Sequence, residues 1–395
     1  MKFEFSPELE AYRAEVRAFV AEHSPGIRPH TGVRAPEPDQ VPAIRAWIAR
    51  LYAAGYLGQS WPVEHGGRPE ARPEHGFIVA EELARARAWG EIGAGALASG
   101  ALLAFGTPEQ KARFLPRIRS GADLWCQMFS EPEAGSDLAA LRTKARLEGD
   151  HYVVDGQKVW TTNGHHADMG YLLARTNQDT AKQAGITAFV VDMRTPGIDV
   201  RPLREITGTN DFNEVFLENV RIPADQVIGK VDDGWRVANV SLGHERSGVG
   251  ARAVELYAQL DDLVELARRT TVRGRPALED AATRQRLGRL ATRVHVTDMM
   301  SKAVKSRIVG GTEDAADAPL AKVFYSEVNL AAAELGVELQ GVDGLAVEGD
   351  PHAYADGWWQ DAFLYSRAYT IAGGANEVLK TVVAERALGL PRDKR

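Results

Sequence analysis

Apolar side chains in the first third of the chain recur at the three- and four-residue spacing of an α-helix. After Ser6 and Pro7 they occupy Leu9, Tyr12 and Val16, so that one face of the segment is apolar. Serine is a preferred N-cap, and proline fits the first helical turn, where no amide hydrogen is needed. This pattern predicts a helix that begins at Pro7.

The same spacing predicts further helices at 41–54 and through "HGFIVAEELARARAWG". A run of small apolar residues, "GAGALASGALLAF" at 93–105, is typical of a buried helix and is too short to span a bilayer. The stretch "TPEQ" that follows has the pattern of a capping box, in which Thr107 and Gln110 cap the next helix reciprocally. The first third is therefore predicted to be helical.

From about Leu124 the pattern changes from helical spacing to alternation. In "RLEGDHYVVDGQKVWTTN" apolar and polar residues alternate around turns at 148–150 and 155–156, as they do in β-hairpins. The runs "GYLLAR", "GITAFVVDM" and "NEVFLENVRIP" are also typical of strands. This predicts a compact all-β insert that ends near Gly229.

Helical spacing returns after Gly234. A long amphipathic helix is predicted from 235 to 269, followed by helices at 280–308, 318–339 and 376–388. The expected fold class is therefore mainly α with a central β-domain. The predicted domains are an N-terminal all-α domain at 1–122, a middle β-domain at 123–231 and a C-terminal all-α domain at 232–395.

Composition narrows the class of protein without naming a function. The net charge of −7, with no polybasic run, argues against binding to nucleic acid or to an anionic membrane. The single cysteine, Cys126, excludes an internal disulfide and any multi-cysteine metal site, and its apolar neighbours predict a packed core thiol. A reducing, cytoplasmic setting is expected.

Two segments carry candidate chemistry. "MFSEPEAGSDL" offers hydroxyls at Ser130 and Ser136 and a flexible backbone at Gly135, which suit either a ligand-binding loop or an ordinary turn. "GQKVWTTNG" offers Trp160 and two threonines, which suit either a wall beside a cofactor ring or a core strand. Taken alone, each segment favours the structural interpretation.

Together, these segments resemble the acyl-CoA dehydrogenase family. Four more stretches match in order over nearly the whole chain, which are "GYLGQSWPVEHGG", "FNEVFLENVRIPADQVIG", "GWRVANVSLGHERSG" and "RAYTIAGGANEVLKTVVAERALG". The resemblance implies a helical N-terminal domain, a β-barrel-like middle domain and a C-terminal four-helix bundle. It also implies a homotetramer or homodimer.

The resemblance further implies tightly bound FAD and oxidation of an acyl-CoA thioester to its trans-2-enoyl form. A carboxylate base removes the α-proton, flavin N5 accepts the β-hydride, and an electron-transfer flavoprotein takes the electrons. The implied flavin contacts in the middle domain are Phe129, Ser130, Gly135, Ser136, Trp160 and Thr162. Ser136 also lies where the family contacts the pantetheine of the substrate.

The position of the base is the main departure from the family pattern. Gly373 stands where many members carry the catalytic glutamate. Other branches, such as the isovaleryl- and long-chain-specific enzymes, carry it on the long helix after the β-domain, directly before an arginine. Glu245 and Arg246 in "LGHERSG" match that placement, which makes Glu245 the expected base and Arg246 an expected substrate contact.

The remaining implied cofactor contacts lie in the C-terminal third. Arg273 is chosen for the FAD pyrophosphate of a neighbouring subunit, with Arg269 and Arg275 as alternatives. Further implied contacts are Gln340, Gly341, Ala375 and Glu377. No metal site is expected, since no carboxylate spacing completes a site around the histidines of "NGHHAD".

Three alternatives remain open from the sequence. The first is an oxidase or monooxygenase of the same fold, in which oxygen takes the electrons. The second is a non-catalytic partner subunit of a heteromeric acyl-CoA dehydrogenase, which the glycine at 373 keeps open. The third is a carrier-protein thioester as the substrate, which retains the same chemistry.

Overall fold

The structure is a computed structural model that describes residues 5–32, 34, 36–244 and 249–392. The described residues form two compact units that alternate along the chain. The helical unit combines residues within 1–22, 73–88 and 247–395, and the sheet unit combines those within 23–72 and 89–246. Within the described ranges, no helix is both long and apolar enough to cross a membrane.

The sheet unit contains one sheet of eight strands. Along the sheet the order is β6-β7-β3-β2-β4-β5-β8, and β1 pairs in parallel with β4. Antiparallel pairing dominates, and β3 with β7 forms the longest ladder. The strands are β1 (Trp125–Met128), β2 (Lys144–Glu148), β3 (His151–Thr162), β4 (Met169–Arg175), β5 (Ile186–Asp192), β6 (Ile198–Leu203), β7 (Phe212–Pro223) and β8 (Val227–Ile228).

Both faces of this sheet are covered by apolar packing. On one face Val154, Phe189 and Val215 belong to a single cluster of buried side chains, so strands from both halves of the sheet curl around a shared core. Cys126 lies in that cluster, and burial raises the pKa of its thiol to about 12. The predicted core thiol is confirmed, and its high pKa makes it a poor nucleophile.

The opposite face is covered by helices α4 (Gly95–Phe105), α5 (Pro108–Arg119) and α6 (Gly234–His244). The predicted capping box is confirmed, because Thr107 accepts from the Gln110 amide and the Gln110 side chain accepts from the Thr107 amide. The amide nitrogen Nε2 of Gln110 also donates to the carbonyls of Asp225 and Val227, at 2.7 and 2.9 Å. One residue therefore caps α5 and fixes it to β8.

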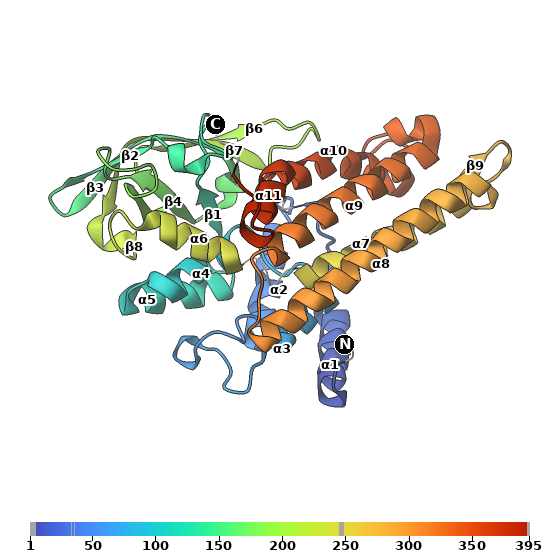
Figure 1. The fold of residues 1–395 in the computed structure, drawn as a ribbon, viewed down its shortest axis with the longest axis horizontal. Coiled ribbons are helices and arrows are strands. Elements are labelled where there is room, and N and C mark those ends of the chain that lie inside the picture. Colours follow the sequence, from blue (N-terminus) through green and yellow to red (C-terminus); the bar gives the residue numbers. More distant parts are fainter. Residues whose placement is uncertain (1–4, 33, 35, 245–248, 393–395) are drawn as a thin grey trace. The chain divides into compact units, whose positions relative to one another are not determined.

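The helical unit is built around a bundle. Leu263, Leu290, Val328 and Trp359 come from four different helices and belong to one buried cluster. In Figure 1, α7 and α8 lie side by side and end at the hairpin that carries β9. The helices are α1 (Pro7–His23), α3 (Pro73–Arg85), α7 (Val249–Arg269), α8 (Ala281–Gly310), α9 (Asp317–Gln340), α10 (Trp358–Ile371) and α11 (Asn376–Val382).

The predicted fold class, mainly α with a central β-domain, is confirmed. The helices of the first third divide between the units, since α1 and α3 pack in the helical unit whereas α2 (Val41–Ala53), α4 and α5 pack in the sheet unit. The sequence patterns did not identify the strands β1, β6 and β8, the helix α10, or the short hairpin of β9 (Thr271–Val272) and β10 (Arg275–Pro276).

An ion-pair network fixes α1 to α3. Arg13 donates to Glu82 at 2.8 Å and to Glu81 at 2.7 Å, and Arg17 donates to Glu82 at 2.8 Å. Burial would raise the pKa of the Glu82 carboxyl, whose side chain is 1% exposed, but the hydrogen bonds from Arg17 and Arg13 outweigh burial and lower the pKa below its usual range. The carboxylate is therefore ionised and satisfied.

We expect Glu82→Gln to lower the free energy of unfolding by about 3 kcal/mol, since it removes the buried charge that pairs with both Arg13 and Arg17 and leaves Arg13 with Glu81 as its remaining hydrogen-bonded carboxylate. Because the folded-state pKa of Glu82 is lowered, its stabilisation is present above the usual glutamate pKa and is lost as pH falls through the lowered value. Urea titrations across acidic pH measure both effects.

The control is Arg85→Gln, because Arg85 is 53% exposed and lies 3.5 Å from the same carboxylate. It should cost less than about 1 kcal/mol. Equal losses in the two variants would contradict the assigned role of the buried network.

Candidate functional site

A buried ion pair connects strand β3 to the loop that follows β1. The Nζ of Lys158 donates to the Phe129 carbonyl at 3.0 Å and to the Glu131 carboxylate at 2.8 Å. The carboxylate also accepts from the amides of Arg142 and Thr143, at 2.6 and 2.9 Å. The loop over 129–137 is thus held to the strand through buried polar contacts.

Both members of the pair are charged near neutral pH. Lys158 is fully buried, and burial lowers its pKa to about 8 against the opposing effect of Glu131. Burial would raise the pKa of Glu131, but the charge and hydrogen bond of Lys158 outweigh it and leave the pKa below its usual range. The sequence analysis missed both residues. A lysine within an apolar strand, with a glutamate on the preceding loop, was the signal available.

Two residues beyond Lys158, the strand presents an exposed tryptophan in a strained conformation. The β3–β7 register shifts between Lys158 and Thr161, so Trp160 lies in a β-bulge. Its φ is 58°, a left-handed value that is uncommon for non-glycine residues. The indole is 60% exposed and meets the Phe212 ring edge to face, with centroids 5.9 Å apart. The bulge therefore turns a large aromatic ring outward.

The other predicted residues of the sheet unit lie on β3 and on the loop that follows β1. Thr162 is half-buried at the end of β3, and the Ser130 carbonyl accepts from the amide of Val159 at 2.9 Å. Gly135 and Ser136 are exposed just beyond the turn that Glu131 closes. The hydrogen bond between Val159 and Ser130 thus joins the two sequence motifs. Each motif also presents an exposed side chain, Ser136 in one and Trp160 in the other.

Phe129 occupies a different place from its neighbours. Its ring is 3% exposed and packs edge to face on Tyr171, with centroids 4.9 Å apart. The ring therefore belongs to the core beneath the helices, and it has almost no free surface for a cofactor. Its carbonyl instead serves as an acceptor for Lys158.

The helical unit holds a second group of predicted residues on the loop between α10 and α11. Gly373 and Gly374 have φ values of 64° and 92°, which glycine adopts readily. Lys322 on α9 donates to the Gly374 carbonyl at 2.7 Å and so holds this loop. Ala375 is the N-cap position of α11, and Glu377 is exposed in its first turn.

Gly373 has room for a side chain but an unfavourable backbone for one. A Cβ added there meets no atom within 4 Å among the described residues. The left-handed φ would cost a non-glycine residue about 1–2 kcal/mol. The proposed base and substrate contact, Glu245 and Arg246, lie outside the described residues.

A third group lies at the other end of α9. Gln340 is the last residue of α9, and Gly341 has φ 60° and ψ −128°, a combination that favours glycine. Eighteen residues separate Lys322 from Gln340, which corresponds to about 27 Å along a helix. Gln340 and Gly341 therefore lie far from Ala375 and Glu377 within one chain.

Arg273 lies on the β9–β10 hairpin. It has φ 53° and Gly274 has φ 75°, the two positive values that a tight type I′ hairpin requires. Arg286, near the start of α8, pairs with Glu338 near the end of α9. Because the hairpin precedes α8, Arg273 belongs to the same end of the bundle as Gln340.

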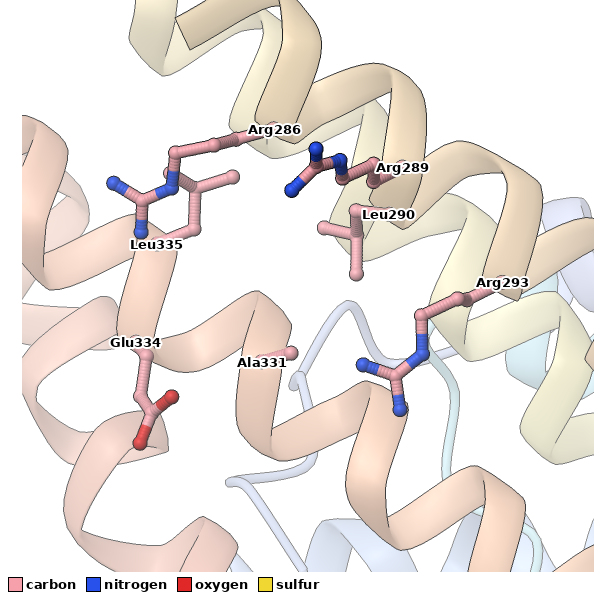
Figure 2. Close-up of a pocket in the computed structure, with 7 residues that line it drawn as sticks. All are labelled: Arg286, Arg289, Leu290, Arg293, Ala331, Glu334 and Leu335. Carbon is pink, nitrogen blue, oxygen red and sulfur yellow. The ribbon is translucent and has the colours of Figure 1, made fainter. Parts of the chain in front are cut away.

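A basic groove of about 240 Å³ lies between α8 and α9 near this end. Figure 2 shows three arginines of α8 on one side and Glu334 of α9 on the other. Arg293 pairs with Glu327 at 3.7 Å, and Arg367 pairs with Glu334 at 3.3 Å. Among the described residues, no group of three His, Cys, Asp or Glu side chains could hold a metal ion.

We expect Lys158→Met to lower the free energy of unfolding by about 3 kcal/mol, because it leaves the Glu131 carboxylate buried without its charged partner. Adding Glu131→Gln should recover part of the loss, since it removes the unpaired buried charge, although the single amide oxygen of glutamine can replace only one of the two carboxylate oxygens that accept from the loop amides. Urea unfolding of the single and double variants measures the coupling.

Lys182→Met is the matched control. Lys182 pairs with Asp137 at 2.8 Å, and both side chains are 61% exposed, so its loss should cost less than about 1 kcal/mol. A double variant no more stable than Lys158→Met would show that the charge of Glu131 is not the cause.

Comparison with known proteins identifies the family. The models described as acyl-CoA dehydrogenase N-terminal, middle and C-terminal domains match residues 6–122, 126–220 and 232–388. Acyl-CoA dehydrogenase IpdE1 of Mycobacterium tuberculosis is 40% identical over 394 residues, covering 98% of this chain and 99% of that protein.

Two solved structures are similar over the whole of both chains. The Tcur3481-Tcur3483 steroid ACAD is 28% identical with a TM-score of 0.87. The ChsE4-ChsE5 complex from Mycobacterium tuberculosis is 29% identical with a TM-score of 0.85. This chain therefore belongs to the acyl-CoA dehydrogenase family, whose members are FAD-dependent flavoproteins that dehydrogenate acyl-CoA thioesters.

Proposed function

We propose that this chain oxidises an acyl-CoA thioester to the trans-2-enoyl-CoA at a site that includes Trp160 and Thr162. The strained, exposed Trp160 is the observation that carries the proposal. The residues present fit a flavin, because the indole is a flat apolar wall, Thr162 offers a hydroxyl, and no described atom lies within 4 Å of a Cβ added at Gly135. Bound FAD would supply the acceptor for the hydride that leaves the β-carbon.

The chain's own part is to hold the thioester and to remove a proton from its α-carbon. We assign proton removal to Glu245 and substrate contacts to Arg246 and Ser136. The α-proton is weakly acidic, so the base must touch that carbon, and burial must raise its pKa toward neutrality. Gly373 supports this assignment, since it offers no carboxylate and leaves open space where a side chain would begin.

The end of the bundle that carries Arg273, Gln340 and Gly341 suggests a role in binding the FAD of a neighbouring subunit. We assign Arg273, Gln340 and Gly341 to the FAD of a second subunit, whereas Ala375 and Glu377 serve the chain's own site. The supporting observation is the separation of about 27 Å along α9 between Gln340 and the loop beside Lys322. Such a division requires an assembly of at least two subunits.

The similar solved structures favour a particular kind of assembly and substrate. One is named a steroid ACAD with two components, and another is a complex of two named components. A heteromer is therefore a candidate beside the homotetramer or homodimer, and steroid-derived acyl-CoAs come first among the substrates to test. An electron-transfer flavoprotein is the proposed acceptor, and rapid reoxidation by air would instead favour an oxidase.

A non-catalytic partner subunit is the second candidate, and Gly373 is the observation that favours it. Protein purified alone with stoichiometric yellow flavin, which an acyl-CoA bleaches without air, would support the catalytic function. Protein that stays colourless when supplied with FAD would support the partner role.

We expect Glu245→Gln to slow flavin reduction by acyl-CoA at least about 100-fold, because a positioned base contributes that much or more. FAD should remain bound. Adding Gly373→Glu should restore part of the rate, since the position is sterically open among the described residues. Anaerobic stopped-flow absorbance measures the rate, and an undiminished rate in Glu245→Gln would refute the assignment.

We expect Trp160→Gly to weaken FAD binding at least about tenfold, while the free energy of unfolding of the FAD-free protein changes by less than about 1 kcal/mol. Glycine relieves the positive φ, and the ring is mostly exposed, so the fold loses little. Flavin titration and urea unfolding measure the two effects. Trp160→Phe, which keeps an aromatic ring, is the control, and unchanged FAD affinity in Trp160→Gly would exclude the ring as a flavin contact.

A further inference from the structure

A polar cluster lies among the helices of the helical unit, where the apolar pattern predicts packing. The Tyr325 hydroxyl on α9 donates to the Glu255 carboxylate on α7 at 3.1 Å. The ring of Tyr325 meets Tyr369 on α10 edge to face, with centroids 5.5 Å apart. The guanidinium of Arg252, one turn before Glu255, lies 5.3 Å from the centroid of the Tyr325 ring. We name Arg252, Glu255, Lys322, Tyr325 and Tyr369 the polar cluster.

The cluster directly adjoins the loop that contains Gly373. Lys322 donates to the Gly374 carbonyl at 2.7 Å and to the Asn376 side chain at 3.0 Å. Tyr369 lies in the last turn of α10, four residues before Gly373. The polar cluster is therefore next to the place where many family members carry the base, and so near the position that the proposed function gives to the acyl group.

The cluster has hydrogen-bonding capacity that no other described residue uses. Arg252 is half-buried, and no hydrogen bond or ion pair joins its guanidinium to any other described residue. The Oε2 of Glu255 accepts from Tyr325, whereas its Oε1 has no hydrogen-bond partner in the described ranges. An arginine has five N–H donors, and a half-buried one that finds no acceptor among the described residues is costly unless an oxygen-bearing group accepts from it.

The charges of the polar cluster also favour a substrate group that accepts hydrogen bonds over a plain alkyl chain. The polar cluster contains two cations, Arg252 and Lys322, and one carboxylate, Glu255, which acts on Arg252, while the exposed Glu377 outside the cluster acts on Lys322. Burial, and then the charge of Arg252, lowers the pKa of Lys322 to about 8, which shows that the two cations affect one another. Burial raises the pKa of Glu255 against the opposing effects of the Arg252 charge and the hydrogen bond from Tyr325. A plain alkyl chain would remove water from these groups without replacing its hydrogen bonds.

We propose that the acyl group oxidised by this protein carries an oxygen function, a carboxylate or a ketone, which accepts hydrogen bonds from Arg252 with Lys322 beside it. This inference rests on the proposed function, because it uses the place of the thioester near Gly373. It adds a specificity determinant, since an acyl-CoA without the oxygen leaves Arg252 unpaired in the complex. Sites that hydrogen-bond a substrate oxygen discriminate more strongly than apolar pockets that sense a missing methylene.

The test compares acyl-CoAs of matched length with the full-length, FAD-loaded protein. Octanoyl-CoA is paired with 7-carboxyheptanoyl-CoA and 7-oxooctanoyl-CoA, and hexanoyl-CoA with its carboxylate and ketone counterparts. Anaerobic flavin reduction gives a rate and an apparent dissociation constant for each. We expect at least one oxygen-bearing acyl-CoA to exceed its apolar partner tenfold or more in the ratio of rate to dissociation constant. The carboxylate and ketone arms tell which acceptor is used.

Variants of Arg252 connect that preference to the cluster. Arg252→Met should lower the ratio for the preferred oxygen-bearing substrate at least tenfold and leave the apolar partner within twofold. Arg252→Lys, which keeps the charge in a different geometry, should recover part of the loss. The control is Arg268→Met, since Arg268 lies on the same helix and is 60% exposed. Arg268→Met should keep the wild-type preference.

The outcomes separate this inference from the proposed function. If octanoyl-CoA or hexanoyl-CoA reduces the flavin and no oxygen-bearing partner does better, the inference is wrong and the dehydrogenase function stands. Equal losses for both substrate types in Arg252→Met would also overturn it, because Arg252 would then act on folding or on the thioester. If no acyl-CoA reduces the bound flavin, the proposed function fails together with the inference.

Discussion

The buried pair of Lys158 and Glu131 is the interaction on which the candidate flavin platform depends. A charge without water is stable only when it is paired and fully hydrogen-bonded. Lys158 meets that condition by bonding Glu131 and the Phe129 carbonyl, and Glu131 by also accepting two loop amides. The loop and the strand consequently behave as one piece. The strained backbone of Trp160 begins two residues further on, where the surrounding contacts can maintain it.

The two compact units carry different parts of the predicted site. The sheet unit presents an aromatic ring, hydroxyls and an open glycine. The helical unit presents the Gly373 loop, and about 27 Å away along α9 it presents Gln340 and Gly341. Helix α9 therefore acts as a rigid spacer between two functional ends. This separation explains why the residues that the family resemblance assigns to FAD lie at two distant places within one folded chain.

The loop between α10 and α11 combines two unusual choices. Gly373 has no side chain at a position where many family members carry a carboxylate. The polar cluster, which consists of an arginine, a lysine, a glutamate and two tyrosines, adjoins this loop. Apolar packing alone would not select those residues, since charged groups beside a core lose hydration. The proposed base at Glu245 accounts for the first choice, and the proposed oxygen-bearing acyl group accounts for the second.

Local patterns in the sequence determined much of the fold, because periodicity and capping depend on residues near one another. They predicted the order of helices and strands, the capping box at Thr107 and the buried thiol of Cys126. They missed α10, although Trp359, Ala362 and Ser366 follow a helical spacing. They also missed the β9–β10 hairpin, where an Arg-Gly pair adopts a turn more often formed by Asn-Gly.

The tertiary structure alone decided the pairing of groups that are distant in sequence. Nothing local joins Lys158 to Glu131, turns Trp160 outward on a bulge, or places Arg252 beside Tyr325 more than seventy residues later. Each of these depends on which strands align and which helices pack, and burial then changes the cost of every charge involved. The sequence indicated the family and the residue types, whereas the folded chain decided which charges are buried together.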